Sequence, residues 1–436
     1  MTNRAGALES LMFVGTSDLA GLVRGKAFPL ADLEERVMFG VGLTGSNIML
    51  SAFGPIYVSP FGTYGDLKLV PDLSTRTAIP ATETADIELV LGDIRTLENA
   101  AWSCCPRSFL RRGLDALEAE HGLRLLAAFE QEFVYTGVPD APGTSYSFDR
   151  FRSAGSFPGR VFGVLRDADI VPDSFLPEYA ARQFEITVKP RQGLRAADDA
   201  VLVREIVRAC AALADARAAF SPVLEPAGVG NGTHIHFSLQ DRSDRGVMYD
   251  AQSPFGISPR AQPFVAGVLE HLPALTALTA PSVASFFRLR PNKWAPVWAN
   301  LGERDRGAAV RVCPLFGGDA ATAARDFNVE FRVADATASP YMALGALVHA
   351  GLDGLRRNLA LPRHPQGPGA DYAAAGVRML PRSLAQALDM LAATPAARGW
   401  LGDELLAAYL MFKRAEIDAV AALTDDETCR RYAEVY

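Results

Sequence analysis

Residues 125–135 read LLAAFEQEFVY, an apolar and aromatic run that contains Glu130-Gln131-Glu132. The run predicts a buried β-strand. Because successive strand side chains point to opposite faces, Glu130 and Glu132 share one face while Gln131 takes the other. Two neighbouring carboxylates repel each other, and burying them without a partner is costly. The pair therefore indicates either the solvated face of an edge strand or a cation bound between the carboxylates.

Three further segments repeat this alternation of one polar and one apolar face, namely Gln183–Lys189, His234–Leu239 and Asn328–Val333. A half-solvated antiparallel sheet predicts the alternation alone. It does not predict that the polar faces carry Glu185, His234, His236, Glu330 and Arg332. A sheet that lines a cavity for divalent cations and a polyphosphate predicts these side chains, because carboxylates favour magnesium or manganese and arginines suit phosphate.

The composition narrows the class of protein. The chain has 436 residues, 49% hydrophobic residues and a net charge of −7, which predicts a globular protein of two or three domains. The chain has no excess of basic residues that could bind the phosphates of a nucleic acid. No run of residues approaches the ~20 apolar positions that a membrane span needs. The five cysteines form no C-x-x-C pair, so we expect a cytoplasmic protein that binds neither nucleic acid nor membrane.

A domain boundary is predicted between residues 105 and 106. Pro106 begins a helical pattern that Gly122 ends, whereas the preceding residues read as a small α+β unit with a helix at Asp32–Phe39. Within that unit, Gly40–Gly45 matches G-x-G-x-x-G, but a helical pattern rather than a strand precedes it. We therefore predict a loop there instead of a dinucleotide site. The Pro-, Gly- and Ser-rich segment Gly137–Gly159 is also predicted to be a loop.

Taken in order, these motifs resemble glutamine synthetase and its γ-glutamylamide and γ-glutamylpolyamine synthetase relatives. They are Glu130-Gln131-Glu132, His234–Leu239, Arg306 with Arg311, and Glu330-Phe331-Arg332 followed by Asp335 and Ser339-Pro340-Tyr341. The resemblance implies an α+β fold. A small β-grasp N-terminal domain would occupy residues 1–105, and a catalytic domain with a curved antiparallel sheet and flanking helices would occupy residues 106–436. It further implies a homo-oligomer of stacked hexameric rings whose active sites lie between neighbouring subunits.

The resemblance also implies ATP and two or three Mg²⁺ or Mn²⁺ ions as cofactors. The implied metal ligands are Glu132, Glu178 and Glu185 for one ion, and Glu130, His234 and Glu330 for the other. His236, Ser238 and Arg306 would contact the nucleotide. Arg288, Arg311, Arg332, Arg306 and Gly230 would hold the carboxylate substrate and the transferred phosphoryl group. Asp66 matches the acidic residue near the family's ammonium pocket.

The sequence departs from the ammonia-using members in places that concern the substrates. Trp294 stands where those members have a glutamate, and Val229 stands where the family has an asparagine that helps to bind glutamate. No D-G-S-S stretch occurs near Gly45-Ser46-Asn47. We therefore predict an ATP-dependent ligase that joins the γ-carboxylate of glutamate to a primary amine through an acyl phosphate, with Trp294 contacting the amine. The alternatives are an ammonia-using glutamine synthetase and a non-catalytic oligomeric scaffold.

Overall fold

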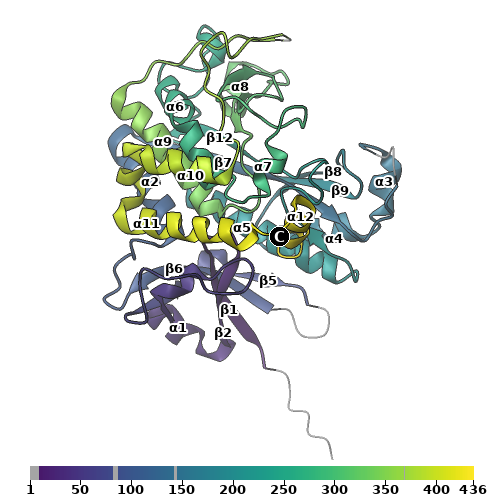
Figure 1. The fold of residues 1–436 in the computed structure, drawn as a ribbon, viewed down its shortest axis with the longest axis vertical. Coiled ribbons are helices and arrows are strands. Elements are labelled where there is room, and N and C mark those ends of the chain that lie inside the picture. The colour runs from purple at the N-terminus through teal and green to yellow at the C-terminus, as the bar shows by residue number, and fades with distance from the viewer. Residues whose placement is uncertain (1–8, 82–86, 142–144, 368) are drawn as a thin grey trace, which may run out of the picture.

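The structure is a computed structural model that describes residues 9–81, 87–141, 145–367 and 369–436. These residues form a six-stranded sheet in the N-terminal part of the chain and a nine-stranded sheet in the remainder. In Figure 1 the smaller, purple part lies below the larger part, which carries most of the helices. The arrangement confirms the predicted α+β class with a small N-terminal unit and a larger unit built on a sheet with flanking helices. The predicted boundary lies between the last strand of the first sheet, which ends at Thr96, and the helix that begins at Pro106.

The N-terminal sheet has the strand order β2-β1-β6-β4-β3, and β5 pairs with β6 outside this path. Its strands are β1 (Leu11–Ser17), β2 (Val23–Pro29), β3 (Val41–Thr44), β4 (Asp66–Pro71), β5 (Thr77–Ile79) and β6 (Ile87–Thr96). The predicted helix near Asp32–Phe39 is present as α1 (Leu33–Phe39). The loop predicted at Gly40–Gly45 is wrong, because residues 41–44 form β3 and pair antiparallel with β4. Gly40 makes the sharp exit from α1 with a φ of 76°.

The larger sheet has the order β13-β14-β15-β12-β7-β9-β8, with β10 and β11 paired to β7. Its main strands are β7 (Leu123–Tyr135), β8 (Pro172–Pro177), β9 (Gln183–Val188), β12 (Thr233–Asp241), β13 (Leu301–Glu303), β14 (Val310–Val312) and β15 (Val329–Phe331). The short strands are β10 (Arg191–Gln192) and β11 (Ala218–Ala219). Neighbouring strands are antiparallel except β13 and β14. The long β7 is therefore central, and the other strands with polar faces lie around it.

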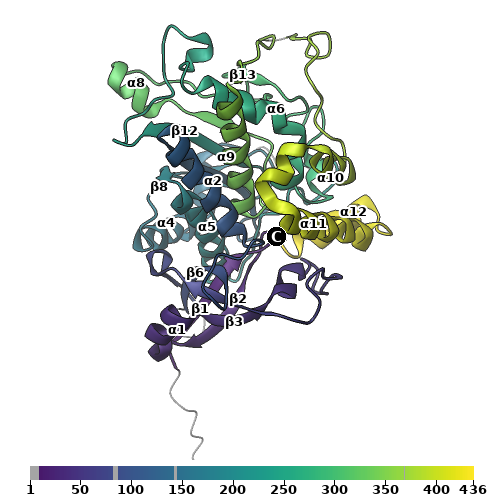
Figure 2. The ribbon, with the colours of Figure 1, turned by 90° about the vertical axis from the view of Figure 1, so that its left-hand side faces the viewer.

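One face of this sheet is covered by helices, of which α2 (Pro106–His121) and α5 (Leu194–Ala212) contact β7 directly. Figure 2 shows these two helices side by side with α9 (Pro340–Arg357) close to them. The other helices are α3 (Phe148–Ser153), α4 (Phe157–Asp167), α6 (Gln262–Thr279), α7 (Ser285–Arg288), α8 (Ala320–Asp326), α10 (Leu384–Ala393), α11 (Pro395–Val420) and α12 (Asp425–Ala433). Predicting a loop throughout Gly137–Gly159 was wrong, because α3 and the start of α4 lie within it; residues 142–144 lie outside the described part. No helix among the described residues is long and apolar enough to cross a membrane.

The two faces of β7 have different partners. Phe129, Gln131 and Phe133 are buried on the face toward the helices. Gln131 donates to the Ala200 carbonyl of α5 at 3.1 Å and accepts from the Arg204 guanidinium of the same helix at 2.6 Å. Because side chains alternate along a strand, this anchoring directs Glu130 and Glu132 to the opposite face, as the sequence predicted.

A buried arginine ties the N-terminal sheet to the helical layer. Arg107 of α2 donates to Asp198 of α5 at 2.9 Å, to Asp93 of β6 at 3.0 Å and to Asp72, just after β4, at 2.7 Å. Its side chain is 1% exposed. Removing one partner from such a buried network leaves uncompensated charge in the interior, and that costs more than losing a surface pair.

We expect Arg107→Ala to lower the free energy of unfolding by about 3–5 kcal/mol, because three carboxylates lose their shared cation. Urea denaturation followed by circular dichroism measures this. Arg111→Ala is the matched control, since Arg111 contacts Asp93 at 2.9 Å but is half-exposed, and we expect it to cost less than about 1 kcal/mol. Equal effects of the two substitutions would contradict the role given to Arg107.

Candidate active site

The polar faces of the larger sheet border a cavity of about 1470 Å³. Most of the predicted site residues line it: Glu130, Glu132, Glu178, Glu185, Gly230, His234, His236, Arg288, Trp294, Arg306, Arg311 and Arg332. Glu330 does not line the cavity, because its carboxylate is buried beneath the arginines that contact it. Ser238 is buried on the same strand as His236 but also lies outside the lining. Asp66 is exposed at the start of β4 in the N-terminal sheet, away from this cavity.

Strand register brings the acidic and histidine side chains together. His234 of β12 pairs with Glu130 of β7, and Glu185 of β9 pairs with Glu132. On the other side of β12, His236 pairs with Glu330 of β15. Because directly paired residues place their side chains on the same face, residues separated by up to 200 positions in the sequence meet in one layer. Alternation in the sequence predicted which face of the sheet each of these side chains occupies. The pairing register between strands determines which of them are neighbours.

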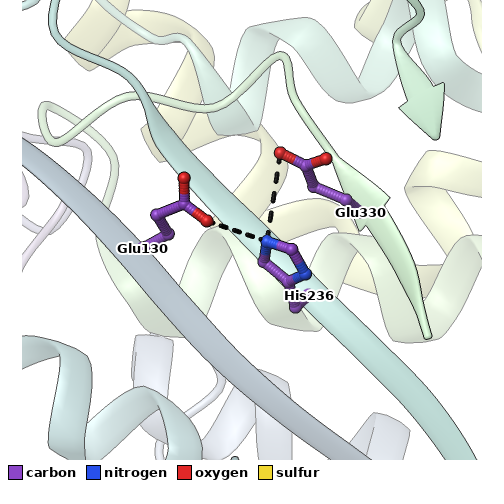
Figure 3. A group of neighbouring side chains, drawn as sticks. All are labelled: Glu130, His236 and Glu330. Carbon is purple, nitrogen blue, oxygen red and sulfur yellow. Dashed lines mark hydrogen bonds and ion pairs between the residues drawn. The ribbon is translucent and has the colours of Figure 1, made fainter. Parts of the chain in front are cut away.

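Two groups in this layer are compact enough to bind an ion. They are Glu130, His236 and Glu330, and Glu130, Glu185 and His234, and the ligand atoms of each lie within 4.8 Å of one another. Figure 3 shows the carboxylates of Glu130 and Glu330 directed at the His236 ring from the two strands that flank β12. The distances to His236 Nε2 are 2.9 Å for Glu130 and 3.9 Å for Glu330. Both groups share Glu130, so they divide the ligands differently from the two sets predicted from the sequence.

The remaining two carboxylates are held at the edge of this layer. Glu132 accepts from the Gly232 amide at 2.8 Å and from the Gln183 side chain at 3.3 Å. Glu178, in the loop after β8, accepts from the Tyr146 hydroxyl at 2.8 Å. These bonds orient the oxygens toward the cavity and leave further lone pairs available as ligands.

The carboxylate layer carries strongly displaced pKa values. Burial, and secondly the charge of Glu132, raise the pKa of Glu178 to about 7. Burial and the charge of Glu130 raise the pKa of Glu185 well above its usual value. Burial acts in the same direction on Glu130, but hydrogen bonds from His234 and His236 hold its pKa well below the usual range. Close like charges in a buried site produce this pattern, and a divalent cation bound among them relieves the repulsion. The oxygen-rich donor set with one or two imidazoles fits magnesium or manganese.

Arginines form the opposite side of the site. Arg311 and Arg332 both donate to the Glu330 carboxylate. Arg288 is buried and donates to the carbonyls of Val333 and Ala334. The Nε atom of each of these three arginines has no hydrogen-bond partner among the described residues. Arg306 is exposed on the loop between β13 and β14. This concentration of positive charge, with donors left over, fits an anionic substrate rich in oxygen.

Two glycines allow close approach beside the carboxylates. A Cβ on Gly230 would lie 2.4 Å from Arg288 Cγ, and one on Gly232 would lie 2.7 Å from His234 Nε2. Either contact is shorter than real Cβ contacts, so a side chain at either glycine would displace the arginine or the histidine. The glycine-rich segment 228–232 thus has a packing reason, because a side chain at Gly230 or Gly232 would move a residue of the site.

Sequence reasoning found Trp294 but missed the other aromatic residues of the cavity. Tyr146 and Tyr179 line it together with Trp294, and Phe316 lies at its border. Tyr146 falls in the segment predicted as a loop. Tyr179 directly follows Glu178, and this adjacency to a predicted metal ligand was the one feature of the sequence that could have indicated its place in the cavity. A tyrosine beside a predicted ligand does not by itself indicate a cavity wall, because the contact with Trp294 joins segments more than 100 residues apart.

Comparison with known proteins places the chain in a family context. The protein-family model described as glutamine synthetase, catalytic domain, matches residues 103–432 of the chain. The family model described as glutamine synthetase N-terminal domain matches residues 3–102. Over 96% of its length the chain is 35% identical to γ-glutamylpolyamine synthetase GlnA3 of Streptomyces coelicolor, 92% of which is covered. Over 90% of its length it is 30% identical to a glutamine synthetase of Pyrococcus furiosus, 86% of which is covered.

Solved structures give the same result for the whole chain. A crystal structure described as a novel glutamine synthase homolog matches with a TM-score of 0.92 and 39% identity, covering 99% of both chains. A structure of GmaS without ligand matches with a TM-score of 0.81 and 25% identity, covering 95% of both chains. Both sheets therefore belong to an architecture found in other proteins.

We expect the affinity for Mn²⁺ to rise from about pH 6 to about pH 8 and then to level off. Below its pKa of about 7, Glu178 carries a proton that the ion must displace, and above that pKa the proton is already lost. Isothermal titration calorimetry in buffers of different ionisation enthalpy measures both the affinity and the protons released.

Tyr146→Phe provides the control for this pH dependence. The substitution removes the hydrogen bond that lowers the pKa of Glu178, so the affinity should level off at a higher pH. An affinity that stays constant through this pH range in the unsubstituted protein would contradict a role for Glu178 in binding the ion.

Proposed function

The chain belongs to the glutamine synthetase family, and from this premise we propose that it joins the γ-carboxylate of glutamate to a primary amine larger than ammonia. Membership makes it an ATP-dependent ligase that forms a C–N bond. The observation that carries the choice of amine is Trp294, which lines the cavity with an apolar ring where the ammonia-using members have a carboxylate. The name of the Streptomyces coelicolor relative, a γ-glutamylpolyamine synthetase, supports an amine as the nucleophile.

The proposed reaction has two steps. A γ-carboxylate oxygen of glutamate attacks the terminal phosphorus of ATP, which releases ADP and leaves an acyl phosphate. The amine nitrogen then attacks the acyl carbon, phosphate leaves with the C–O bonding electrons, and the nitrogen loses a proton. Two or three Mg²⁺ or Mn²⁺ ions, when bound, neutralise phosphate charge.

The residues of this chain act mainly by electrostatics and position. Glu130, Glu132, Glu178, Glu185, His234 and Glu330 are proposed to hold the ions. Arg306 and Arg332 are proposed to stabilise the phosphoryl group as it moves between two anions, since guanidinium groups stay charged and match phosphate geometry. Arg288, Arg311 and Gly230 are proposed to bind the carboxylate substrate, and His236 and Ser238 the nucleotide. Glu330 positions Arg311 and Arg332 by pairing with both.

Ammonia provides the rival substrate within the same family. Desolvating a small ammonium ion needs negative groups around it. Trp294 supplies a flat apolar surface instead, and Val229 beside Gly230 is another apolar residue at the same end of the cavity. A non-catalytic scaffold is disfavoured because a layer of buried like charges destabilises a fold that does not bind a cation.

We expect phosphate release from ATP with glutamate and an alkyl or aryl amine to exceed that with ammonia by at least roughly tenfold in kcat/KM. A coupled phosphate assay across a panel of amines, each with and without glutamate, measures this. Trp294→Glu should narrow the gap, because it restores negative charge beside the amine. Efficient turnover of ammonia with no larger amine accepted would restore an ordinary glutamine synthetase, and no turnover at all would favour the scaffold.

We also propose a homo-oligomer, assembled as stacked hexameric rings, in which a neighbouring N-terminal unit completes each site. The position of Asp66 supports this, because it is exposed on the N-terminal sheet and does not reach the cavity of its own chain. Mass photometry of the purified protein tests the assembly. A monomer with full turnover would contradict the proposed assembly. If the protein forms rings but Asp66→Ala leaves turnover of ammonia and of amines unchanged, Asp66 does not take part in the site.

A further inference from the structure

Three aromatic side chains form a continuous wall at one end of the cavity. The Tyr179 and Trp294 rings lie nearly parallel, with centroids 6.0 Å apart and planes 12° apart. The Tyr146 ring meets Tyr179 edge-on, with centroids 5.3 Å apart. Although they contact one another, the three residues remain 54%, 53% and 67% exposed for Tyr146, Tyr179 and Trp294. We call these three residues the aromatic wall. It offers a large apolar surface that no other described residue covers.

The backbone around Trp294 is bent in a way that maintains this arrangement. Trp294 has a φ of 54°, in the left-handed region that disfavours bulky side chains, and Asn292, a residue type that tolerates this region, has a φ of 62°. Between them, Lys293 donates its ammonium group to the carbonyls of Ala227 and Gly228, which holds this turn against the glycine-rich segment. Strained positions of this kind are found where a site requires a side chain in one place.

The wall adjoins the carboxylate layer at Glu178. Tyr146 donates to Glu178, and Tyr179 follows it in the chain, with its amide donating to the same carboxylate at 3.2 Å. A ligand that extends from the metal ligands along the wall therefore meets negative charge at one end and ring faces over the rest of its length. An amine nitrogen with a carbon tail has this distribution of polarity, and a cationic nitrogen also interacts favourably with ring faces.

Among the described residues of one subunit, a second positive charge on the tail has no further carboxylate to meet at this end of the cavity. Apart from the carboxylate layer, the acidic residues among the described cavity lining are Asp173 and Asp326. Asp173 is paired with Lys189 and Asp326 with Arg325. Asp173 lies near the start of β8 and Glu178 follows the end of this strand, so the five positions between them separate the two residues by roughly 15 Å. The nearest charged neighbour of Trp294 along the chain is Lys293, which is positive.

We propose that the aromatic wall selects monoamines with an apolar alkyl or aryl tail over diamines and polyamines. This rests on the proposed function and names the class of amine it uses. The tail lies across the exposed faces of Tyr179 and Trp294, with the nitrogen toward Glu178. Burying the carbon atoms of an apolar tail against the wall is favourable, whereas a terminal ammonium group there would lose its water without gaining a carboxylate of the same chain. The selection therefore differs from that named for the Streptomyces coelicolor relative.

Pentylamine and putrescine provide a matched pair, because they have the same number of non-hydrogen atoms and differ by a terminal methyl or ammonium group. We expect kcat/KM for pentylamine to exceed that for putrescine by at least roughly tenfold in the phosphate-release assay, with spermidine no better than putrescine. Tyr179→Ala and Trp294→Ala should each bring this ratio toward one, while the thermal shift caused by manganese and ATP stays as in the unsubstituted protein.

Two control variants separate the wall from general effects. Tyr179→Phe keeps the ring and should keep the ratio. Phe316→Ala removes an almost fully exposed ring from the other end of the cavity and should also keep the ratio. Phe316 lies near Cys313, whose thiol is 3.7 Å from His236 Nδ1. A preference for putrescine or spermidine, or a ratio that neither alanine variant changes, would overturn the inference and leave the proposed function intact. Absence of phosphate release with every amine would instead refute the proposed function.

Discussion

Repulsion among the closely spaced carboxylates of Glu130, Glu132, Glu178 and Glu185, of which the last two are buried, is the constraint on which the site depends. Without a cation these groups would tend to protonate or separate. The pKa values of Glu178 and Glu185 are raised first by burial and then by the charges of the neighbouring glutamates. The backbone does not allow separation, because ladder hydrogen bonds of β7 with β9 and β12 fix Glu132 opposite Glu185 and Glu130 opposite His234. The stability of the rest of the fold therefore offsets the unfavourable free energy of keeping these charges close, and a bound divalent cation reduces that repulsion. A sheet is suited to this task because its register cannot shift by one residue without moving every apolar side chain out of the core.

The anchoring of β7 from behind makes this register difficult to lose. Gln131 points away from the site, yet its bonds to the Ala200 carbonyl and to Arg204 hold the residue between the two glutamates. Arg204 extends the same network to the carbonyls of Ala336 and Ala338, just before α9. A polar side chain on the core face is costly unless its partners are complete, and here they are. The middle residue of Glu130-Gln131-Glu132 thus contributes to the site without facing it, because a rotation of the strand at this point would move both carboxylates.

The sequence was informative wherever a strand has a fixed period and silent wherever distant segments meet. Alternation in LLAAFEQEFVY predicted which face each glutamate takes, and the same rule worked for His234, His236 and Glu330. Alternation within one strand does not say which residues of neighbouring strands pair. The sharing of Glu130 between the two possible ion-binding groups was therefore not predictable from it. Residues 41–44 were mistaken for a loop because a strand of four residues, interrupted by Gly42 and flanked by Gly40 and Gly45, is too short to show the period that identifies strands. Tyr146 and Tyr179 were missed for a further reason, since their significance comes from Trp294, which reaches them through a turn with unusual backbone angles.

The two ends of the cavity differ in what determines their chemistry. At the His236 end, Glu130, Glu330 and the arginines form an interlocked set of full charges, and a change in any one alters the environment of the others. Such a set resists gradual change, because removing one member leaves a buried charge without its partner. At the Trp294 end the wall consists of exposed rings on loops, whose replacement costs little stability because few atoms pack against them. A fold with this division can keep phosphoryl chemistry constant while the nucleophile varies. It follows that differences in amine use within such a family should concentrate in the loops that carry Tyr146, Tyr179 and Trp294, and not in the strands that carry the carboxylates.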